Sequence, residues 1–415
     1  MEFGKDQDNE SNIDQDYSNQ RKKIVNIYNN IKRELILEYF TGIYRFQLID
    51  GELRTSNWKL KALGILIVSI YTAAFIWFII PDPSDCITGL HVFLNNIDDF
   101  PCIFVLIQYI ASMITCNFLM NSKNVRSITL LGEVDTILQV EKIEDFYKKI
   151  ESKLNKYLIL LILTHFIHGV LDVFSSDDII WEMTILPLYL NQKIVVLIFC
   201  SYVIMLNSRL RLINSYLREF IQEQDKRSIP VFTVRYTKTK NEKTLNYIGR
   251  PSIRNTKIRD LATTYDIMGE ICFMVNEIFN FQIFISLVTT FTFIVITIWT
   301  SLNVYRKPDY QSSQLINVLI WCMNMICNVA AMSFACERLL VLRNETRILV
   351  NKIIMNYNLP KTMRVQAKAF MELVEAWPLR IYVYDMFSID ITLMLKFISV
   401  ATTYLIVLIQ ISHFI

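Results

Sequence analysis

The chain has 415 residues, of which 53% are apolar and 13% aromatic, with a formal net charge of +3 and a mean hydropathy of +0.33. A soluble protein of this length would form roughly two or three domains, with apolar residues recurring at a helical or strand period. Here they gather in long runs, which indicates repeated crossing of a lipid bilayer. The sequence contains no basic tract with interleaved aromatic residues, so a nucleic-acid surface is not predicted.

Seven stretches are apolar enough to cross the membrane as helices. A hydrocarbon core of about 30 Å needs roughly 20 helical residues, because every backbone polar group must be satisfied within the segment. The third stretch is short and the fourth is interrupted by Gln192 and Lys193. The sequence therefore predicts an all-α polytopic membrane protein with seven transmembrane helices, at residues 60–80, 101–120, 157–174, 183–206, 271–299, 315–336 and 386–411.

Lysine and arginine placement predicts the orientation, because cytoplasmic segments retain positive residues. Segments 1–59, 121–156, 207–270 and 337–385 together hold thirty-seven of them, whereas the alternate segments and the C-terminal tail hold two. The N-terminus is therefore expected in the cytoplasm and the C-terminus outside, the reverse of a G-protein-coupled receptor. The polar start of the chain predicts no cleavable signal peptide.

Two spans are expected to continue into the cytoplasm as amphipathic helices. Leu210, Ile213, Leu217 and Ile221 follow the fourth span at helical spacing, and a similar pattern follows the sixth span as far as Pro360. Their apolar faces need a partner, so we expect a cytoplasmic bundle that either joins subunits or packs within one subunit.

The remaining cytoplasmic segments complete a division into four regions. Residues 362–376 predict a separate amphipathic helix, and residues 222–255 predict a loop. We expect a cytoplasmic N-terminal segment at 1–59, six transmembrane helices with a ligand cavity at 60–336, a cytoplasmic anchor at 337–385, and the last helix with a short extracellular tail at 386–415.

The last span carries a polar stripe. Its members follow one another at steps of four, three, four and seven residues, which places them on one helical face: Thr392, Lys396, Ser399, Thr403 and Gln410. Polar groups avoid lipid because their desolvation is costly. The stripe therefore either lines a water-filled pore built from several copies of the helix or forms hydrogen bonds to other helices of the same chain.

The C-terminal motif resembles a family signature. The run Thr403-Tyr404-Leu405-Ile406-Val407-Leu408-Ile409-Gln410 resembles the Thr-Tyr, five apolar residues, Gln-Phe signature of insect gustatory receptors, and residues 387–395 are similar to the segment that opens the family's last helix. The departure is Ile411, where the family usually has Phe. Chain length, seven spans and inverted orientation fit the same family.

The resemblance implies a chemosensory channel in the plasma membrane. It implies a ligand-gated, cation-permeable channel of four subunits, a homotetramer or a heterotetramer with related subunits, opened by a small-molecule tastant. The last helix would line the pore, with Gln410 and Ile411 at the gate and Ser399, Thr403 and Tyr404 along the path. Lys396 would then lie in the inner vestibule, extend to the interface, or pair with Asp390.

Polar residues in the outer halves of the other spans are candidates for ligand binding. Aromatic rings with a few polar groups suit a small organic ligand. Interhelical hydrogen bonding, packing or the interfacial belt is the ordinary alternative for each residue. No cofactor or metal site is expected. The candidates are His165, His168 and Asp172 on one face of the third span, with Tyr109, Tyr189, Asn191, Gln192, Thr289, Thr292, Trp299, Trp321 and Asn324 on other spans.

Several alternatives remain at this point. No catalytic motif is present, so an enzyme is not expected. An insect odorant receptor would share the architecture, whereas a G-protein-coupled receptor would need the opposite orientation and a transporter would show paired Gly/Pro-interrupted spans. Cys86 and Cys102 lie at the predicted outer face, either as a disulfide or as two thiols.

Overall fold

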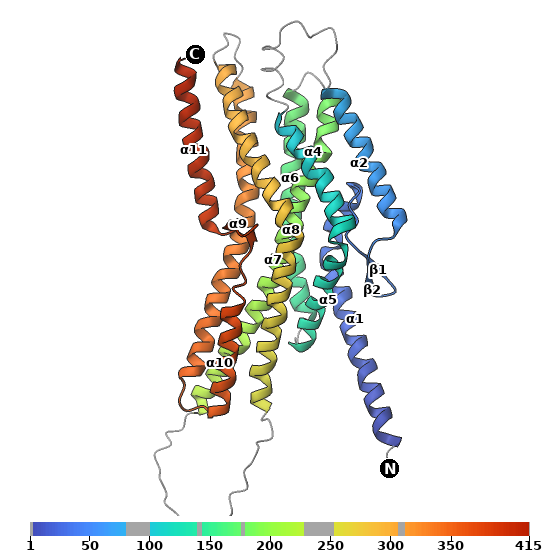
Figure 1. Ribbon diagram of the computed structural model, residues 1–415, viewed down its shortest axis with the longest axis vertical. Coiled ribbons are helices and arrows are strands. Elements are labelled where there is room, and N and C mark those ends of the chain that lie inside the picture. Colours follow the sequence, from blue (N-terminus) through green and yellow to red (C-terminus); the bar gives the residue numbers. More distant parts are fainter. Residues whose placement is uncertain are drawn as a thin grey trace, which may run out of the picture.

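The computed structural model describes residues 3–79, 100–138, 143–175, 179–227, 253–305 and 312–414. The helices run lengthwise in one elongated bundle, with the N-terminus at one end and the C-terminus at the other (Figure 1). Termini at opposite ends are what an odd number of crossings requires. Hereafter the end at which α7 ends and α8 begins is called the inner end.

The membrane-spanning helices agree with the prediction. Six helices in the described part of the chain are long and apolar enough to cross a bilayer, and the apolar 24-residue α11 (Ile391–Phe414) brings the number to the predicted seven. A short π-helix, η2 (Thr115–Leu119), continues the second span. The six are α2 (Trp58–Ile79), α4 (Phe100–Ile114), α6 (Ile143–Ser175), α7 (Ile179–Arg227), α8 (Ile253–Tyr305) and α9 (Ser312–Met355).

The predicted extensions of the fourth and sixth spans are present as continuous helices. The 49 residues of α7 extend over roughly 70 Å at 1.5 Å per residue, more than twice the hydrocarbon thickness. Leu210 and Leu217 in α7 and Leu339 in α9 are buried. The separate amphipathic helix is also present as α10 (Lys361–Ala376). Its apolar face is buried and includes Met363, Phe370 and Val374.

The predicted loop at 222–255 is too wide at both ends. α7 continues to Arg227 and α8 begins at Ile253, well before the predicted start of the fifth span; residues 228–252 lie outside the described residues. Ile258, Leu261 and Tyr265 are buried at helical spacing among polar neighbours. This apolar period explains why the helix starts early.

The N-terminal segment is more ordered than its polarity suggests. Helix α1 (Phe3–Phe40) and a hairpin of β1 (Gln47–Ile49) and β2 (Glu52–Arg54) precede α2. A further helix, α5 (Asn121–Ile137), follows the second span. α1 packs against α5, α6 and α7, and it buries one face made of Ile24, Ile27, Ile31 and Leu35.

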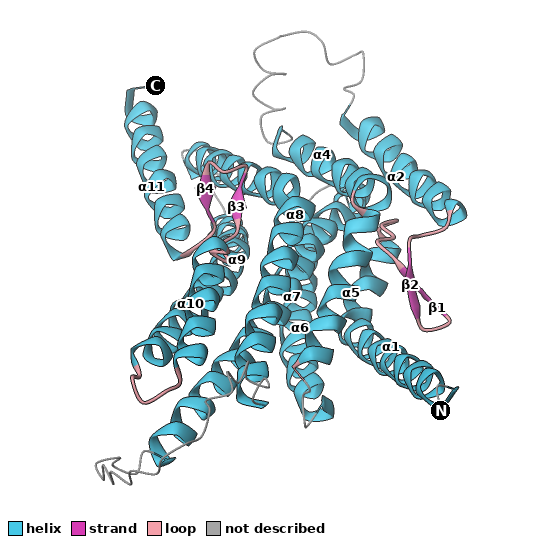
Figure 2. Ribbon diagram, turned by 60° about the horizontal axis from the view of Figure 1, so that its bottom comes forward, coloured by secondary structure: helices cyan, strands magenta, loops and turns pink. Residues whose placement is uncertain are grey.

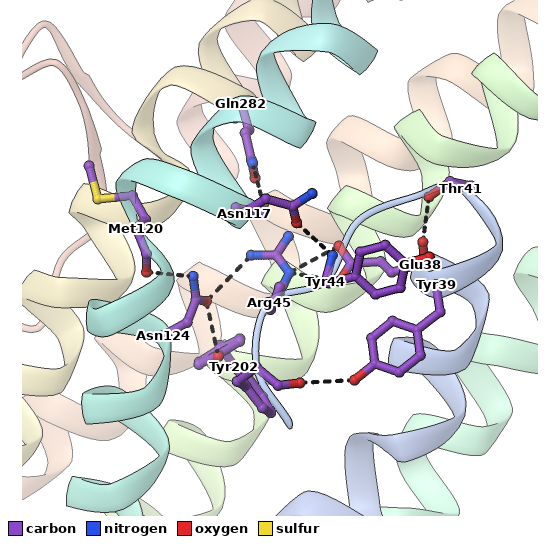
Figure 3. Close-up of polar contacts among 12 residues, drawn as sticks. Glu38, Tyr39, Thr41, Tyr44, Arg45, Asn117, Met120, Asn124, Tyr202 and Gln282 are labelled. Carbon is purple, nitrogen blue, oxygen red and sulfur yellow. Dashed lines mark hydrogen bonds and ion pairs between the residues drawn. The ribbon is translucent and has the colours of Figure 1, made fainter. Parts of the chain in front are cut away.

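A buried ion pair fixes the end of α1 inside the bundle. The Nε of Arg45 donates to both carboxylate oxygens of Glu38 at 2.9 and 2.8 Å, and both side chains are fully buried. The Arg45 guanidinium also donates to Asn124 Oδ1 (Figure 3). It lies over the Phe279 ring as well, 5.0 Å from the ring centroid. Removing one partner of such a pair typically costs about 3–5 kcal/mol, because the other charge stays buried without compensation.

The π-helix η2 completes this polar cluster. Asn117 of η2 accepts from the Tyr44 backbone N–H at 2.6 Å and donates to the Gly42 carbonyl at 3.1 Å (Figure 3). Gly42 has a φ of 77°, and the backbone there approaches Gly64 of α2 so closely that an added Cβ on Gly64 would lie 2.4 Å from the Gly42 oxygen. The turn after α1 is thereby held between α2 and the second span.

One buried carboxyl in α1 makes the inner end sensitive to pH. Glu34 is 1% exposed, and neither of its carboxylate oxygens has a hydrogen-bond partner among the described residues. Burial raises the pKa of Glu34 from 4.5 to about 7. The charged groups that act on it are Arg33 in α1 and Glu151 in α6, which pair with each other at 3.2 Å.

We predict that Glu34→Gln flattens part of the pH dependence of stability. Because the folded pKa lies above the unfolded value, the contribution of Glu34 is fully present below pH 4.5 and is lost as pH rises through about 7. The difference between the folded and unfolded pKa values of Glu34 corresponds to roughly 3 kcal/mol in the free energy of unfolding. Thermal unfolding of the purified full chain across this range measures it, with the exposed Glu372→Gln as control. Equal pH dependence in the wild type and Glu34→Gln would contradict the assignment.

Candidate functional site

The last helix begins at a capped turn. Asp390 follows a hairpin of β3 (Tyr382–Val383) and β4 (Phe387–Ser388). Its Oδ1 accepts the backbone N–H groups of Thr392 and Leu393 at 2.9 and 3.2 Å, and its Oδ2 accepts the Ser388 hydroxyl at 2.7 Å. Asp390 is therefore the N-cap of α11. This role accounts for its carboxylate without the pairing to Lys396 considered from the sequence.

One face of α11 packs against the bundle. Phe397 and Tyr404 place their rings edge-to-face on Phe291 of α8, with centroids 6.2 and 5.4 Å apart. α11 also contacts α9 and stands at the margin of the bundle (Figure 2). Phe397 and Tyr404 thus define the packed face of α11, so Tyr404, which the family resemblance placed along the pore path, packs against α8 within the subunit.

The polar stripe lies on the other side of α11. At about 100° per residue, its centre is roughly 120° away from the packed face. No helix in the described part of the chain covers the stripe, so hydrogen bonding to other helices does not account for it. The Thr403 hydroxyl donates to the Ser399 carbonyl of its own helix at 2.9 Å. The side chain of Ile411 lies outside the described residues. The five stripe residues are all exposed: Thr392, Lys396, Ser399, Thr403 and Gln410.

The segment that leads into α11 is attached to α8. The backbone N–H groups of Tyr382 and Tyr384 donate to Asn276 Oδ1 at 3.1 Å and Asn280 Oδ1 at 2.7 Å. Asn276 and Asn280 lie one turn apart on α8, so both face the hairpin. Movement of α8 would consequently be transmitted to the start of α11.

A second attachment joins α8 to the end of α10. The Trp377 indole donates to Asp266 Oδ1 at 2.7 Å, and its ring lies against Gly269, where an added Cβ would be 2.3 Å from the ring. Only glycine permits this approach. These attachments were not expected from the sequence, where the available signal was Gly269 in the middle of a helix.

The predicted face of the third span forms a buried polar pair. Nδ1 of His168 lies 2.9 Å from Asp172 Oδ2, and both side chains are nearly inaccessible. His165, one turn earlier on α6, is half-buried and interacts electrostatically with the same pair. The three residues are therefore together, as their spacing predicted.

Helix α7 contributes the opposite wall of this cluster. Tyr189 and Lys193 lie one turn apart, and both interact electrostatically with Asp172. Lys193 is 4% exposed, and its Nζ has no hydrogen-bond partner among the described residues. The Tyr189 hydroxyl lies 3.4 Å from Cys102 Sγ of α4. Lys193 and Cys102 were not among the predicted ligand residues, although the i, i+4 spacing from Tyr189 to Lys193 was a signal.

Two neighbouring amides add capacity for hydrogen bonds. Asn191 and Gln192 are buried. Within the described residues, the Asn191 amide and the Gln192 Nε2 have no partner. Buried amides without partners are costly in a membrane, so a bound polar group would be favoured beside them.

The other predicted ligand residues lie elsewhere. The Tyr109 hydroxyl donates to the Thr41 carbonyl at 2.7 Å, next to the end of α1. The Thr289 and Thr292 hydroxyls donate to carbonyls one turn earlier in α8. Trp299 and Asn324 are half-buried on α8 and α9.

Two earlier predictions fall outside what the structure describes. The side chain of Trp321 lies outside the described residues, as does Cys86. Whether Cys86 and Cys102 form a disulfide therefore stays a prediction.

The fold is similar to that of solved insect receptors. Two structures of the insect olfactory receptor OR5 from Machilis hrabei superpose with TM-scores of 0.66 and 0.65, at 10% and 12% identity, and the first of them is in complex with eugenol. Each match covers 94% of this chain and 99% of the other. At this identity the likeness shows the fold.

The sequence itself matches a family model described as 7tm Chemosensory receptor over residues 34–413. No curated protein matches at a significant level. The matched family comprises receptors and not enzymes, as the lack of catalytic motifs predicted. Since the match spans nearly the whole sequence and the structure has the expected apolar helices, the chain is a multi-pass membrane protein that belongs to the 7tm chemosensory receptor family.

Proposed function

We propose that this chain is a subunit of a ligand-gated, cation-permeable channel opened by a small-molecule tastant. The observation that carries the proposal is the stripe of α11, whose five polar residues are exposed on the side away from the packed face. Copies of this helix around an axis would enclose the hydroxyl groups of Thr392, Ser399 and Thr403 and the amide of Gln410, which can replace ion hydration. The Lys396 ammonium would lie near the inner start of the stripe, where a wide vestibule, the interface or salt screening offsets its charge. A taste ligand is favoured over an odorant by the Thr403 to Gln410 motif.

Assembly into a tetramer is supported by the inner part of α9. Val341, Ile348 and Met355 are spaced seven residues apart and are 49%, 57% and 59% exposed. Apolar residues spaced seven apart lie along one line of a helix, and a line of exposed apolar side chains favours contact with another subunit. In the proposed orientation this stripe is cytoplasmic, so it would join subunits below the pore.

The ligand is proposed to bind at the α6–α7 cluster around His168, Asp172, Tyr189 and Lys193. Eugenol, which is bound in one of the Machilis receptor structures, is a small aromatic molecule with polar groups. The cluster combines an aromatic ring with polar and charged side chains, which suit a ligand of that kind. Tyr189 contacts Phe293 of α8 with ring centroids 5.7 Å apart. Because α8 also holds the hairpin before α11 through Asn276 and Asn280, α8 provides a continuous connection from ligand to pore.

For the gate, we expect Ile411→Ala to leak without ligand, because a wider and less apolar ring hydrates more easily. Gln410→Ala is expected to change conductance or ion preference, because it removes an amide that can replace water around a cation. Single-channel recording measures both, with Ile398→Ala, on another face of α11, as control. If both gate variants match the wild type in resting leak, conductance and selectivity, α11 does not line the pore.

For the ligand site, His168→Ala is expected to raise the half-maximal concentration of any agonist about tenfold, the loss of roughly one charge-assisted hydrogen bond. The maximal current should change little. Dose–response recordings at equal surface expression measure this, with the lipid-facing Phe166→Ala on the same helix as control. An unchanged half-maximal concentration with a reduced maximal current would assign His168 a structural role instead.

A further inference from the structure

A pocket at the inner end of the bundle has no role in the function proposed above. Its volume is about 250 Å³, and it lies where the end of α5 meets the inner parts of α7 and α8. The volume is slightly below the range of about 300–1,000 Å³ typical of small-molecule sites. It therefore suits a molecule with one ring and a short chain.

The walls of the pocket are apolar and partly aromatic. Leu217 and Phe220 line it from α7, and Ile258 and Leu261 line it from α8. All four side chains are buried. Tyr216 adds a second ring. Such a wall binds the apolar body of a ligand, and aromatic rings also attract cations through their faces.

The rim of the pocket is acidic. Glu219 and Glu223 from α7 and Asp260 from α8 are exposed around it, against a single Lys257. Within the described residues, none of these three carboxylates forms an ion pair within 4.0 Å. Three carboxylates without ion pairs are unusual in this part of the sequence, because segment 207–270 holds thirteen Lys and Arg.

The end of α5 adds to the negative potential. Leu138, the C-cap of α5, lines the pocket, and its carbonyl accepts from the Tyr216 hydroxyl at 3.2 Å. The C-terminus of a helix carries a partial negative charge and favours nearby cations. Apolar walls, aromatic rings, three carboxylates and a helix C-terminus together select a positive group attached to an apolar body.

We propose that this pocket binds a small amphipathic cation, an ammonium group on a single apolar ring, at a site separate from the ligand cluster of α6 and α7. In the proposed orientation the pocket opens to the cytoplasm. Because α7 and α8 run without interruption from the pocket into the membrane, an occupant there would bear directly on helices that lead to the ligand cluster and to α11.

The test uses phenethylammonium and its neutral counterpart 2-phenylethanol on the purified full chain in lipid nanodiscs. Phenethylammonium is expected to bind more tightly. Neutralising the rim by Glu219→Gln, Glu223→Gln or Asp260→Asn is expected to weaken its binding by up to about fivefold each, the upper range for exposed charges. The control is Glu372→Gln, an exposed carboxyl on α10, which should leave binding unchanged.

The location is tested with a phenethylammonium that carries a photoreactive diazirine. Labelling is expected within 216–223 and 257–264 and should fall when unlabelled phenethylammonium is added. Equal affinity for the ammonium and the alcohol, equal weakening by Glu372→Gln, or labelling confined to other helices would overturn the proposal. These are binding measurements, so their outcome does not depend on whether the chain conducts ions.

Discussion

The buried ion pair between Glu38 and Arg45 is the interaction on which the inner half of the molecule depends. It holds the end of α1 against α5 through Asn124 and against α8 through the Phe279 ring. A charge in this place is tolerated only because both partners are present and hydrogen-bonded. With α1 fixed, the turn at Gly42 can contact both α2 and η2, so α1, α2, η2, α5 and α8 meet around this ion pair.

The sequence predicted the parts of the fold that lipid constrains. A bilayer allows few solutions, so apolar runs predicted the spans, and the polar stripe of α11 could be read from its spacing alone. The helices at the inner end, outside the apolar spans, were harder to predict from the sequence. Glu34, Glu38 and Arg45 have the composition of a solvent-exposed segment, yet tertiary packing buries them, and α1 was therefore missed. The early start of α8 was hidden in the same way by its charged neighbours.

At the candidate site, spacing along one helix was informative and proximity between helices was not. His165, His168 and Asp172 share a face of α6, as their positions required. That Tyr189 and Lys193 approach Asp172 from α7 depends on how the two helices cross, and Gly169, against which Leu186 packs, permits that close approach. Likewise, the hydrogen bonds from the hairpin to Asn276 and Asn280 join segments about a hundred residues apart, beyond the reach of local patterns.

We propose that the exposed stripe of α11 faces a water-filled ion path. The most direct test is the reaction of an introduced cysteine with a positively charged, membrane-impermeant thiol reagent while current is recorded. Thr403→Cys lies on the stripe, whereas Ile398→Cys lies on another face of the same helix. If the stripe lines the ion path, the reagent will change the agonist-evoked current of Thr403→Cys and leave the currents of Ile398→Cys and the wild type unaffected. A Thr403→Cys channel that responds to agonist but never to the reagent would contradict it.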